Sequence, residues 1–143
     1  MSEQIENLIP HRHPFLFVDE IVSVSTNEII AVKTFGDNDN MLKGSFPEHQ
    51  FVPGTILIES MAQAGGAGVR LLGVAEGIFA LVQIESAQFL GGVTYDTEVK
   101  YVIKNIRLSE KIIKQSGKAY VGAKVVLEAT WMSIKMDEKQ LTK

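Results

Sequence analysis

The sequence predicts an α+β fold in which one buried helix is surrounded by antiparallel strands. Residues 54–72 run without a proline and place apolar side chains on nearly every side of a helix, which is typical of a buried helix. Most of the remaining chain consists of β-branched and aromatic runs separated by turn residues, as expected for strands. At 143 residues, the chain 1–143 is expected to form one domain that needs neither disulfides nor a structural metal.

The N-terminal third of the chain predicts a short helix followed by a hairpin. Ser2 can cap the helix and Pro10 ends it. Two strand-like runs, 15–25 and 29–35, are separated by a polar turn and predict an antiparallel pair. A polar, irregular loop then extends to Pro53.

The central and C-terminal parts predict the long helix and the rest of the sheet. The helix 54–72 contains glycines that weaken it but let strands approach its backbone closely: Gly65, Gly66 and Gly68. The later runs, 78–90, 97–109 and 111–136, predict three or four further strands.

Charge and hydropathy exclude several classes of function. A net charge of −3 argues against a nucleic-acid-binding protein. Segment 97–124 is nonetheless basic, so it either attracts an acidic macromolecule or forms the solvated faces of strands. No apolar run is long enough to span a bilayer and the first residues do not read as a secretory signal. We therefore expect a cytoplasmic protein with no membrane insertion.

Glu59 is a single acid in an otherwise apolar stretch of the predicted helix. Gln63 and Arg70 lie close to the same helix face, so the three residues form either a solvent-facing stripe or the polar edge of a cleft. In an apolar cleft, desolvation favours a protonated carboxyl group, which suits proton donation. The helix opens at Pro53-Gly54, where unpaired backbone N–H groups can hold an oxygen that gains negative charge.

Four segments resemble one enzyme family over essentially the whole chain and in the family's order. They are "IPHRHPFLFVDEI" (9–21), "GSFPEHQFVPGTILIESMAQA" (44–64), "IESAQF" (84–89) and "GKAYVGAKVVLEATWM" (117–132). They resemble the FabZ-type β-hydroxyacyl-acyl-carrier-protein dehydratases. The resemblance implies the hot-dog fold, a long central helix wrapped by a curved antiparallel sheet. It also implies a homodimer joined edge to edge, often a trimer of dimers, with active-site tunnels at the subunit interface.

The same resemblance implies roles for three positions. Glu59 matches the acid that protonates the departing hydroxyl, and Gly54 matches the amide that holds the thioester oxygen. The family's base is a histidine in a Gly-His-Phe-Pro loop, and Ser45 stands at its position, with the spacing from 45 to 59 preserved. A serine hydroxyl is too weak a base for a thioester α-proton, and loss of a positioned base typically costs about 10²–10⁴-fold in rate.

Other side chains are assigned auxiliary or binding roles. His49 is a candidate replacement base and Gln63 a candidate auxiliary group. His11 is expected to fix the start of the first strand, and His13 to lie at the surface or at the tunnel gate. These three histidines, in two places, do not predict a metal site. The acyl tunnel is expected to be lined by Phe46, Pro53, Met61, Phe79, Leu81 and Phe89.

The predicted function is a (3R)-hydroxyacyl-acyl-carrier-protein dehydratase, a hydro-lyase of fatty acid or related polyene or polyketide synthesis. It would need no cofactor of its own, because the substrate is carried on the phosphopantetheine of acyl carrier protein, the expected partner. Three alternatives remain open. The chain is a base-deficient subunit that forms a heterodimer with a His-containing paralogue, a non-catalytic acyl-carrier-binding module, or a hot-dog thioesterase that uses the helix carboxylate.

Overall fold

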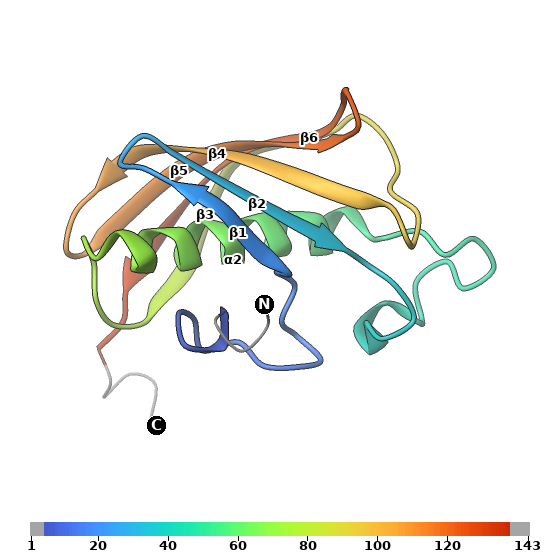
Figure 1. Cartoon of the computed structure of the whole chain (residues 1–143), viewed down its shortest axis with the longest axis horizontal. Coiled ribbons are helices and arrows are strands. Elements are labelled where there is room, and N and C mark those ends of the chain that lie inside the picture. The colour runs from blue at the N-terminus through green and yellow to red at the C-terminus, as the bar shows by residue number, and fades with distance from the viewer. Residues whose placement is uncertain (1–4, 138–143) are drawn as a thin grey trace.

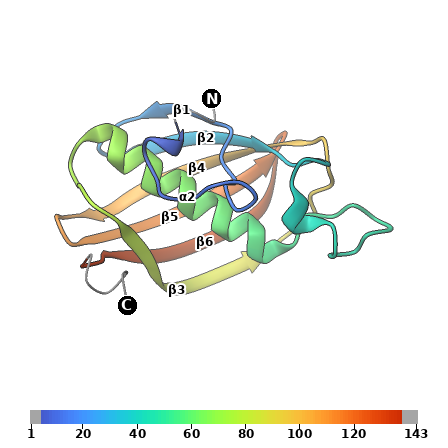
Figure 2. The ribbon, with the colours of Figure 1, turned by 90° about the horizontal axis from the view of Figure 1, so that it is seen from below.

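In the part of the chain that the structure describes, six antiparallel strands form one curved sheet, and one long helix lies across one of its faces (Figures 1 and 2). The computed structural model describes residues 5–137. Along the sheet the strand order is β1-β2-β4-β5-β6-β3. The strands are β1 (Glu20–Val24), β2 (Glu28–Thr34), β3 (Phe79–Phe89), β4 (Glu98–Leu108), β5 (Ile112–Val121) and β6 (Lys124–Lys135). This arrangement confirms the predicted α+β hot-dog fold.

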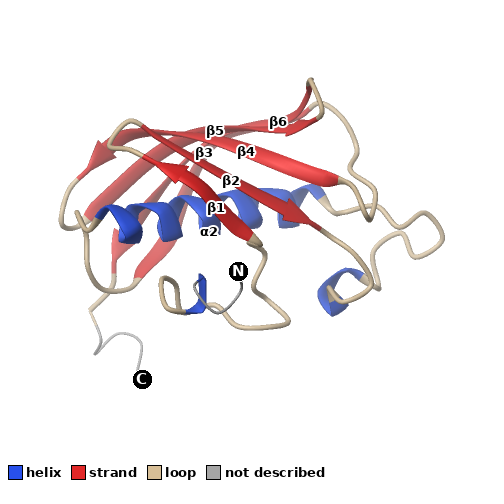
Figure 3. Cartoon of the chain, viewed as in Figure 1, coloured by secondary structure: helices blue, strands red, loops and turns tan. Residues whose placement is uncertain are grey.

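Helix α2 spans Gly54–Leu72, the range predicted from the sequence. It begins directly after Pro53 and ends at Gly73, whose φ of 74° is the left-handed conformation that commonly terminates helices. Glycines bring the helix close to the sheet: a β-carbon at Gly68 would lie 2.6 Å from the Ile29 side chain. Figure 3 shows how the strands curve over this helix.

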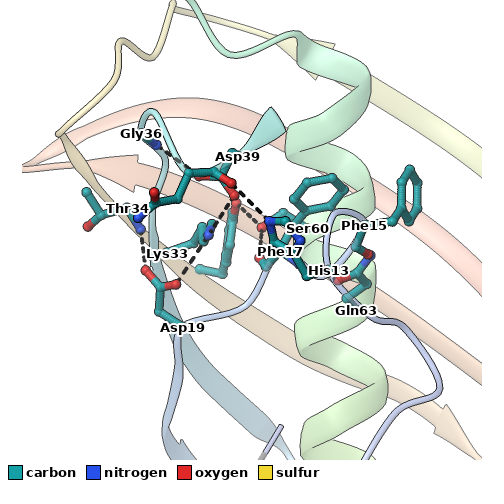
Figure 4. Close-up of polar contacts among 12 residues, drawn as sticks. His13, Phe15, Phe17, Asp19, Lys33, Thr34, Gly36, Asp39, Ser60 and Gln63 are labelled. Atoms are coloured by element: carbon teal, nitrogen blue, oxygen red, sulfur yellow. Dashed lines mark hydrogen bonds and ion pairs between the residues drawn. The ribbon is translucent and has the colours of Figure 1, made fainter. Parts of the chain in front are cut away.

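The segment before β1 was predicted to begin a strand at residue 15, but β1 starts at Glu20. The reason is visible in Figure 4, where two helix side chains take the backbone hydrogen bonds that a neighbouring strand would otherwise supply. Gln63 accepts from the Phe17 amide and donates to the Phe15 carbonyl, and Ser60 donates to the Phe17 carbonyl. Residues 15–17 are therefore bonded to the helix and lie outside the sheet.

In the described residues, the predicted N-terminal helix is represented by helical residues 5 and 6 and the turn that follows them. The amides of Leu8 and Ile9 both donate to the carbonyl of Ile5. Ile5 and Ile9 are buried against the core, in keeping with the amphipathic pattern. Ser2, the predicted cap, lies outside the described residues.

The C-terminal half contains four strands, the upper number predicted. Run 111–136 divides into β5 and β6 at a turn containing Gly122, whose φ is 58°. Strand β3 pairs with β6 on one side only and forms one edge of the sheet. Its apolar side chains Val82, Ile84 and Phe89 are exposed.

The loop between β2 and α2 is anchored at its start by a largely buried cluster of charges (Figure 4). Lys33 Nζ lies 3.2 Å from Asp39 Oδ1 and 3.3 Å from Asp19 Oδ1. Asp39 also accepts a hydrogen bond from the Gly36 amide. Further along, Asn40–Leu42 forms a short 3₁₀ helix, η1. Within residues 5–137, no helix combines the length and apolar character needed to cross a membrane.

Candidate active site

A cavity of about 320 Å³ lies between α2, the N-terminal segment and the start of β3. Its size falls in the usual range for small-ligand pockets. Most of its wall is apolar. The polar residues come from the helix and the N-terminal segment, with Gln115 of β5 and Ser133 of β6 in addition. The apolar wall includes Ile9, Val69, Phe79, Leu81 and Ile113, and the polar side chains include His11, Glu59, Gln63 and Arg70.

Glu59 faces this cavity from the helix with its side chain 23% exposed. Gln63, one helical turn later, donates from Nε2 to Glu59 Oε2 over 2.8 Å. Gln63 is buried beneath the segment 15–17, so it does not belong to a solvent-facing stripe. Arg70 is exposed at the far end of the cavity. The acid and its amide partner therefore form the polar edge of an apolar cleft.

His11 lies beside the same carboxylate, with Nε2 3.6 Å from Glu59 Oε2. Its ring stacks on Phe15 with the ring centroids 6.4 Å apart. Burial lowers the pKa of His11, the charge of Glu59 opposes this, and Arg12 adds to the lowering. The Nδ1 atom is buried and has no hydrogen-bond partner among the described residues. Sequence patterns predict for His11 only a role in fixing the start of the first strand, and none of them indicates its place beside this carboxylate.

The N-terminus of α2, where Gly54 was expected to supply the amide for the thioester oxygen, is not in the described lining of this cavity. Pro53 occupies the cap position, and no side chain caps this end of the helix. The amides of Ile56 and Leu57 donate to the Pro53 carbonyl. The amides of Gly54 and Thr55 precede them and have no carbonyl within the helix to bond. The ring of Phe89, at the end of β3, lies directly against Gly54. Because Gly54 has no side chain, the ring of Phe89 can pack directly on this end of the helix.

The loop that carries Ser45 does not contribute to the cavity around Glu59, whose described lining contains no residue between 36 and 54. Phe46 is 63% exposed and has a φ of 46°, a strained conformation for a bulky residue. His49 is also exposed, with its ring 6.1 Å from that of Phe51. Within one chain, position 45 and Glu59 therefore do not share this cavity.

The residues expected to line an acyl tunnel fall into separate groups. Phe79 and Leu81 line the cavity beside Glu59. Met61 is fully buried in the core, where it faces Gly117 of β5. Phe46, Pro53 and Phe89 lie outside this cavity, in the loop and near the helix N-terminus. Throughout residues 5–137, no three His, Cys, Asp or Glu side chains are grouped so that they could hold a metal ion.

A family model described as a FabA-like domain matches residues 9–130. The chain belongs to the FabA-like family. Within it, the 3-hydroxyacyl-[acyl-carrier-protein] dehydratase FabZ of Sulfurimonas denitrificans is 33% identical and covers 94% of this chain and 96% of its own length. The FabZ of Thermotoga petrophila is also 33% identical, over 89% of this chain and 91% of the relative. The resemblance to FabZ-type dehydratases is thereby confirmed.

Solved structures with the same fold include a dehydratase complex and a hypothetical thioesterase. The dehydratase heterocomplex ApeI:P from Xenorhabdus doucetiae matches with a TM-score of 0.81 at 19% identity, over 96% of this chain and 93% of that one. A hypothetical thioesterase with coenzyme A from Streptococcus pneumoniae matches with a TM-score of 0.65 at 12% identity, over 94% and 93%. At these identities the likeness concerns the fold.

Proposed function

We propose that the protein acts as a (3R)-hydroxyacyl-acyl-carrier-protein dehydratase, which removes water from a carrier-bound 3-hydroxyacyl thioester to give the trans-2-enoyl thioester. The observation that carries this proposal is Glu59 on the wall of an apolar cavity, fixed by Gln63. A carboxyl group placed there can protonate the departing hydroxyl while the acyl chain lies against apolar side chains. The amide of Gly54 would hold the thioester oxygen as charge develops on it. Proton transfer between substrate and side chains needs no cofactor.

The α-proton requires a base, and Ser45 cannot supply one without activation. This favours a second candidate, in which the chain is the acid-bearing subunit of a hetero-dehydratase. The exposed loop around Phe46 and the open edge of β3 support it, because both present surfaces that a second subunit can cover. A His-containing relative paired at that edge would bring its own loop histidine to Glu59. For the first candidate, a dehydratase made of this chain only, we propose a homodimer or a trimer of dimers.

The decisive experiment follows hydration of a trans-2-enoyl thioester by loss of its enoyl absorbance. We expect slow turnover by the natural chain and a gain of about 10²–10⁴-fold in Ser45→His, because the missing base is restored. Adding Glu59→Gln to that variant should abolish the gain. A folded Ser45→His protein without activity, or activity that ignores Glu59, would overturn the dehydratase proposal.

Mixing separates the two candidates. A His-containing relative whose own helix glutamate is replaced by glutamine lacks the acid, and this chain lacks the base. Activity that appears only when the two are combined, and disappears with Glu59→Gln in this chain, identifies the hetero-dehydratase. The same mixtures are assayed for free thiol, whose Glu59-dependent release would instead identify a thioesterase. If the protein binds acylated acyl carrier protein but catalyses none of these reactions, it is a non-catalytic carrier-binding module.

A further inference from the structure

Glu59 is held by two neighbours whose hydrogen-bonding roles can be worked out atom by atom. The first is Gln63, whose amide orientation is set by the backbone. The Phe17 N–H is a donor, so it faces the amide oxygen at 2.8 Å, and the Phe15 carbonyl is an acceptor, so it faces the amide nitrogen at 3.1 Å. Gln63 Nε2 therefore donates to Glu59 Oε2. Oε2 is an acceptor, and a transferable proton on this carboxyl group belongs on Oε1.

The second neighbour is His11, whose Nε2 lies 3.6 Å from the same Oε2. A neutral imidazole carries one N–H and one lone pair, and the structure distinguishes the two nitrogens. Nδ1 is buried without a partner among the described residues. Buried N–H groups without a partner are rare, while an acceptor without one is tolerated better. The proton therefore belongs on Nε2, where it points to the oxygen that Gln63 has already fixed as an acceptor.

The structure assigns His11 as a positioning residue for Glu59: it is neutral, carries its proton on Nε2, and with Gln63 directs two donors at Oε2. This inference rests on the proposed function for its catalytic meaning. At 3.6 Å the contact is longer than a hydrogen bond, but catalytic hydrogen bonds are often long before substrate binds.

The proposed role follows the proton through the reaction. The base takes the α-proton of the thioester, and the electrons of that C–H bond form the new double bond. The bond from the β-carbon to the hydroxyl breaks as Glu59 Oε1 gives its proton to the departing oxygen, so that water leaves. Glu59 is then a carboxylate, and the N–H groups of His11 and Gln63 stabilise its new charge at Oε2. A donor at His11 thus favours the proton transfer and affects kcat rather than substrate binding.

The first test is independent of activity. Nitrogen-15 NMR of the natural full-length protein distinguishes the two neutral tautomers and the imidazolium, with the His11 signals assigned by their loss in His11→Phe. We expect a neutral ring protonated at Nε2 near neutral pH. A ring protonated at Nδ1, or a doubly protonated ring, would overturn the assignment whether or not the protein is a dehydratase.

The second test compares variants by enoyl hydration, in the natural chain or, if that is silent, in Ser45→His. Glutamine places an amide donor near the Nε2 position of histidine, whereas phenylalanine keeps the ring that stacks on Phe15 but has no donor. We expect His11→Phe to lower kcat about tenfold, as for loss of one hydrogen bond to a charged group. His11→Gln should restore most of this, with KM little changed in both.

The control is His13→Phe. Of the two places expected for this neighbouring histidine, the structure gives it the surface: it is exposed and is not in the described lining of the cavity. It should leave kcat and KM unchanged. Equal loss of kcat in His11→Gln and His11→Phe would show that the ring acts only through packing, and would overturn the positioning role. Absence of all turnover, even in Ser45→His, counts against the dehydratase proposal and not against the role of His11. In that case the NMR experiment alone tests whether His11 is neutral and protonated on Nε2.

Discussion

The ring of Phe89, at the end of β3, lies against the first residue of the central helix: a β-carbon added at Gly54 would lie 2.5 Å from ring atom Cε1. No other residue type fits Gly54 without moving this ring. The contact joins the edge strand to the helix end whose amide is proposed to hold the thioester oxygen. The space beside the Gly54 amide is therefore determined by both the start of α2 and the end of β3.

Gly54→Ala should lower the rate of enoyl hydration by about 10²-fold, the usual effect of disturbing one oxyanion donor. The added methyl group and the displaced ring both crowd the amide. Phe89→Ala in the same chain should recover part of the rate, because it removes the ring. Gly44→Ala is the matched control, since a β-carbon there meets nothing within 4 Å. Equal rates in Gly54→Ala and Gly44→Ala would contradict the proposed role of this amide.

A buried chain of hydroxyl groups predicts non-additive stabilities. Tyr101 donates to Ser60 Oγ over 2.6 Å, and Ser60 donates to the Phe17 carbonyl over 2.6 Å. Burial raises the pKa of Tyr101 and keeps it protonated as a donor. Ser60→Ala leaves two buried groups unpaired and should cost about 2–4 kcal/mol in the free energy of unfolding, whereas Tyr101→Phe should cost about 1 kcal/mol.

The double variant Ser60→Ala/Tyr101→Phe should be no less stable than Ser60→Ala alone, because removing the tyrosine hydroxyl also removes one of the unpaired groups. Urea denaturation of all four proteins gives the coupling energy directly. Simple addition of the two single costs would show that the hydroxyl groups do not form one chain.

Lys33 should be far more important for stability than other lysines of the sheet. Its side chain is 8% exposed and contacts Asp39, which is 11% exposed. Lys33→Met leaves that carboxylate buried without its cation and should cost about 3–5 kcal/mol. The control is Lys104→Met, where the ion pair with Glu28 is on the surface and should contribute about 0–1 kcal/mol. Similar urea midpoints for the two variants would contradict this difference.

Burial of His11 predicts a loss of stability in acid. Its pKa is lowered in the folded protein, so as pH falls through the ordinary value of about 6.5 the unfolded chain takes up the proton first. The charged groups acting on it are Glu59, which opposes the shift, and Arg12, which adds to it. Relative to His11→Gln, the natural protein should lose unfolding free energy below that pH and show a constant difference above it.

Urea denaturation of both proteins across this pH range measures the effect. A difference that is flat, or that favours the natural protein in acid, would show that folding does not lower the pKa of His11. The two remaining histidines are present in both proteins, so their titration cancels in the comparison.

Local patterns in the sequence were enough to predict the helix and most of the sheet. A proline before residue 54 and a glycine after residue 72 mark the ends of the helix, and both ends match the structure. The start of β1 was predicted too early because residues 15–17 have strand-like composition. Their hydrogen-bond partners are the side chains of Ser60 and Gln63, which only tertiary structure brings to them.

In the candidate site, too, some contacts follow from local sequence spacing and others depend on tertiary structure. Glu59 and Gln63 are one helical turn apart, so their contact follows from local spacing. The approach of His11 depends on the path of the N-terminal segment over the helix, and periodicity carries no information about that path. One available signal was Gln63 itself: a glutamine in an apolar helix needs buried partners, and the backbone of residues 15–17 supplies them.

The glycines between helix and sheet have a consequence for how the sequence can change. Gly68 faces Ile29 across the gap between helix and sheet, and Gly117 faces Met61 of the helix. Gly117 is also close to Trp131 and Ile103 of the sheet. Enlarging one member of such a pair forces a clash, and shrinking the other alone opens a cavity. Substitutions at these positions should therefore be accepted in compensating pairs. Among variant libraries of this protein, the helix and the sheet should show linked changes of size at these positions.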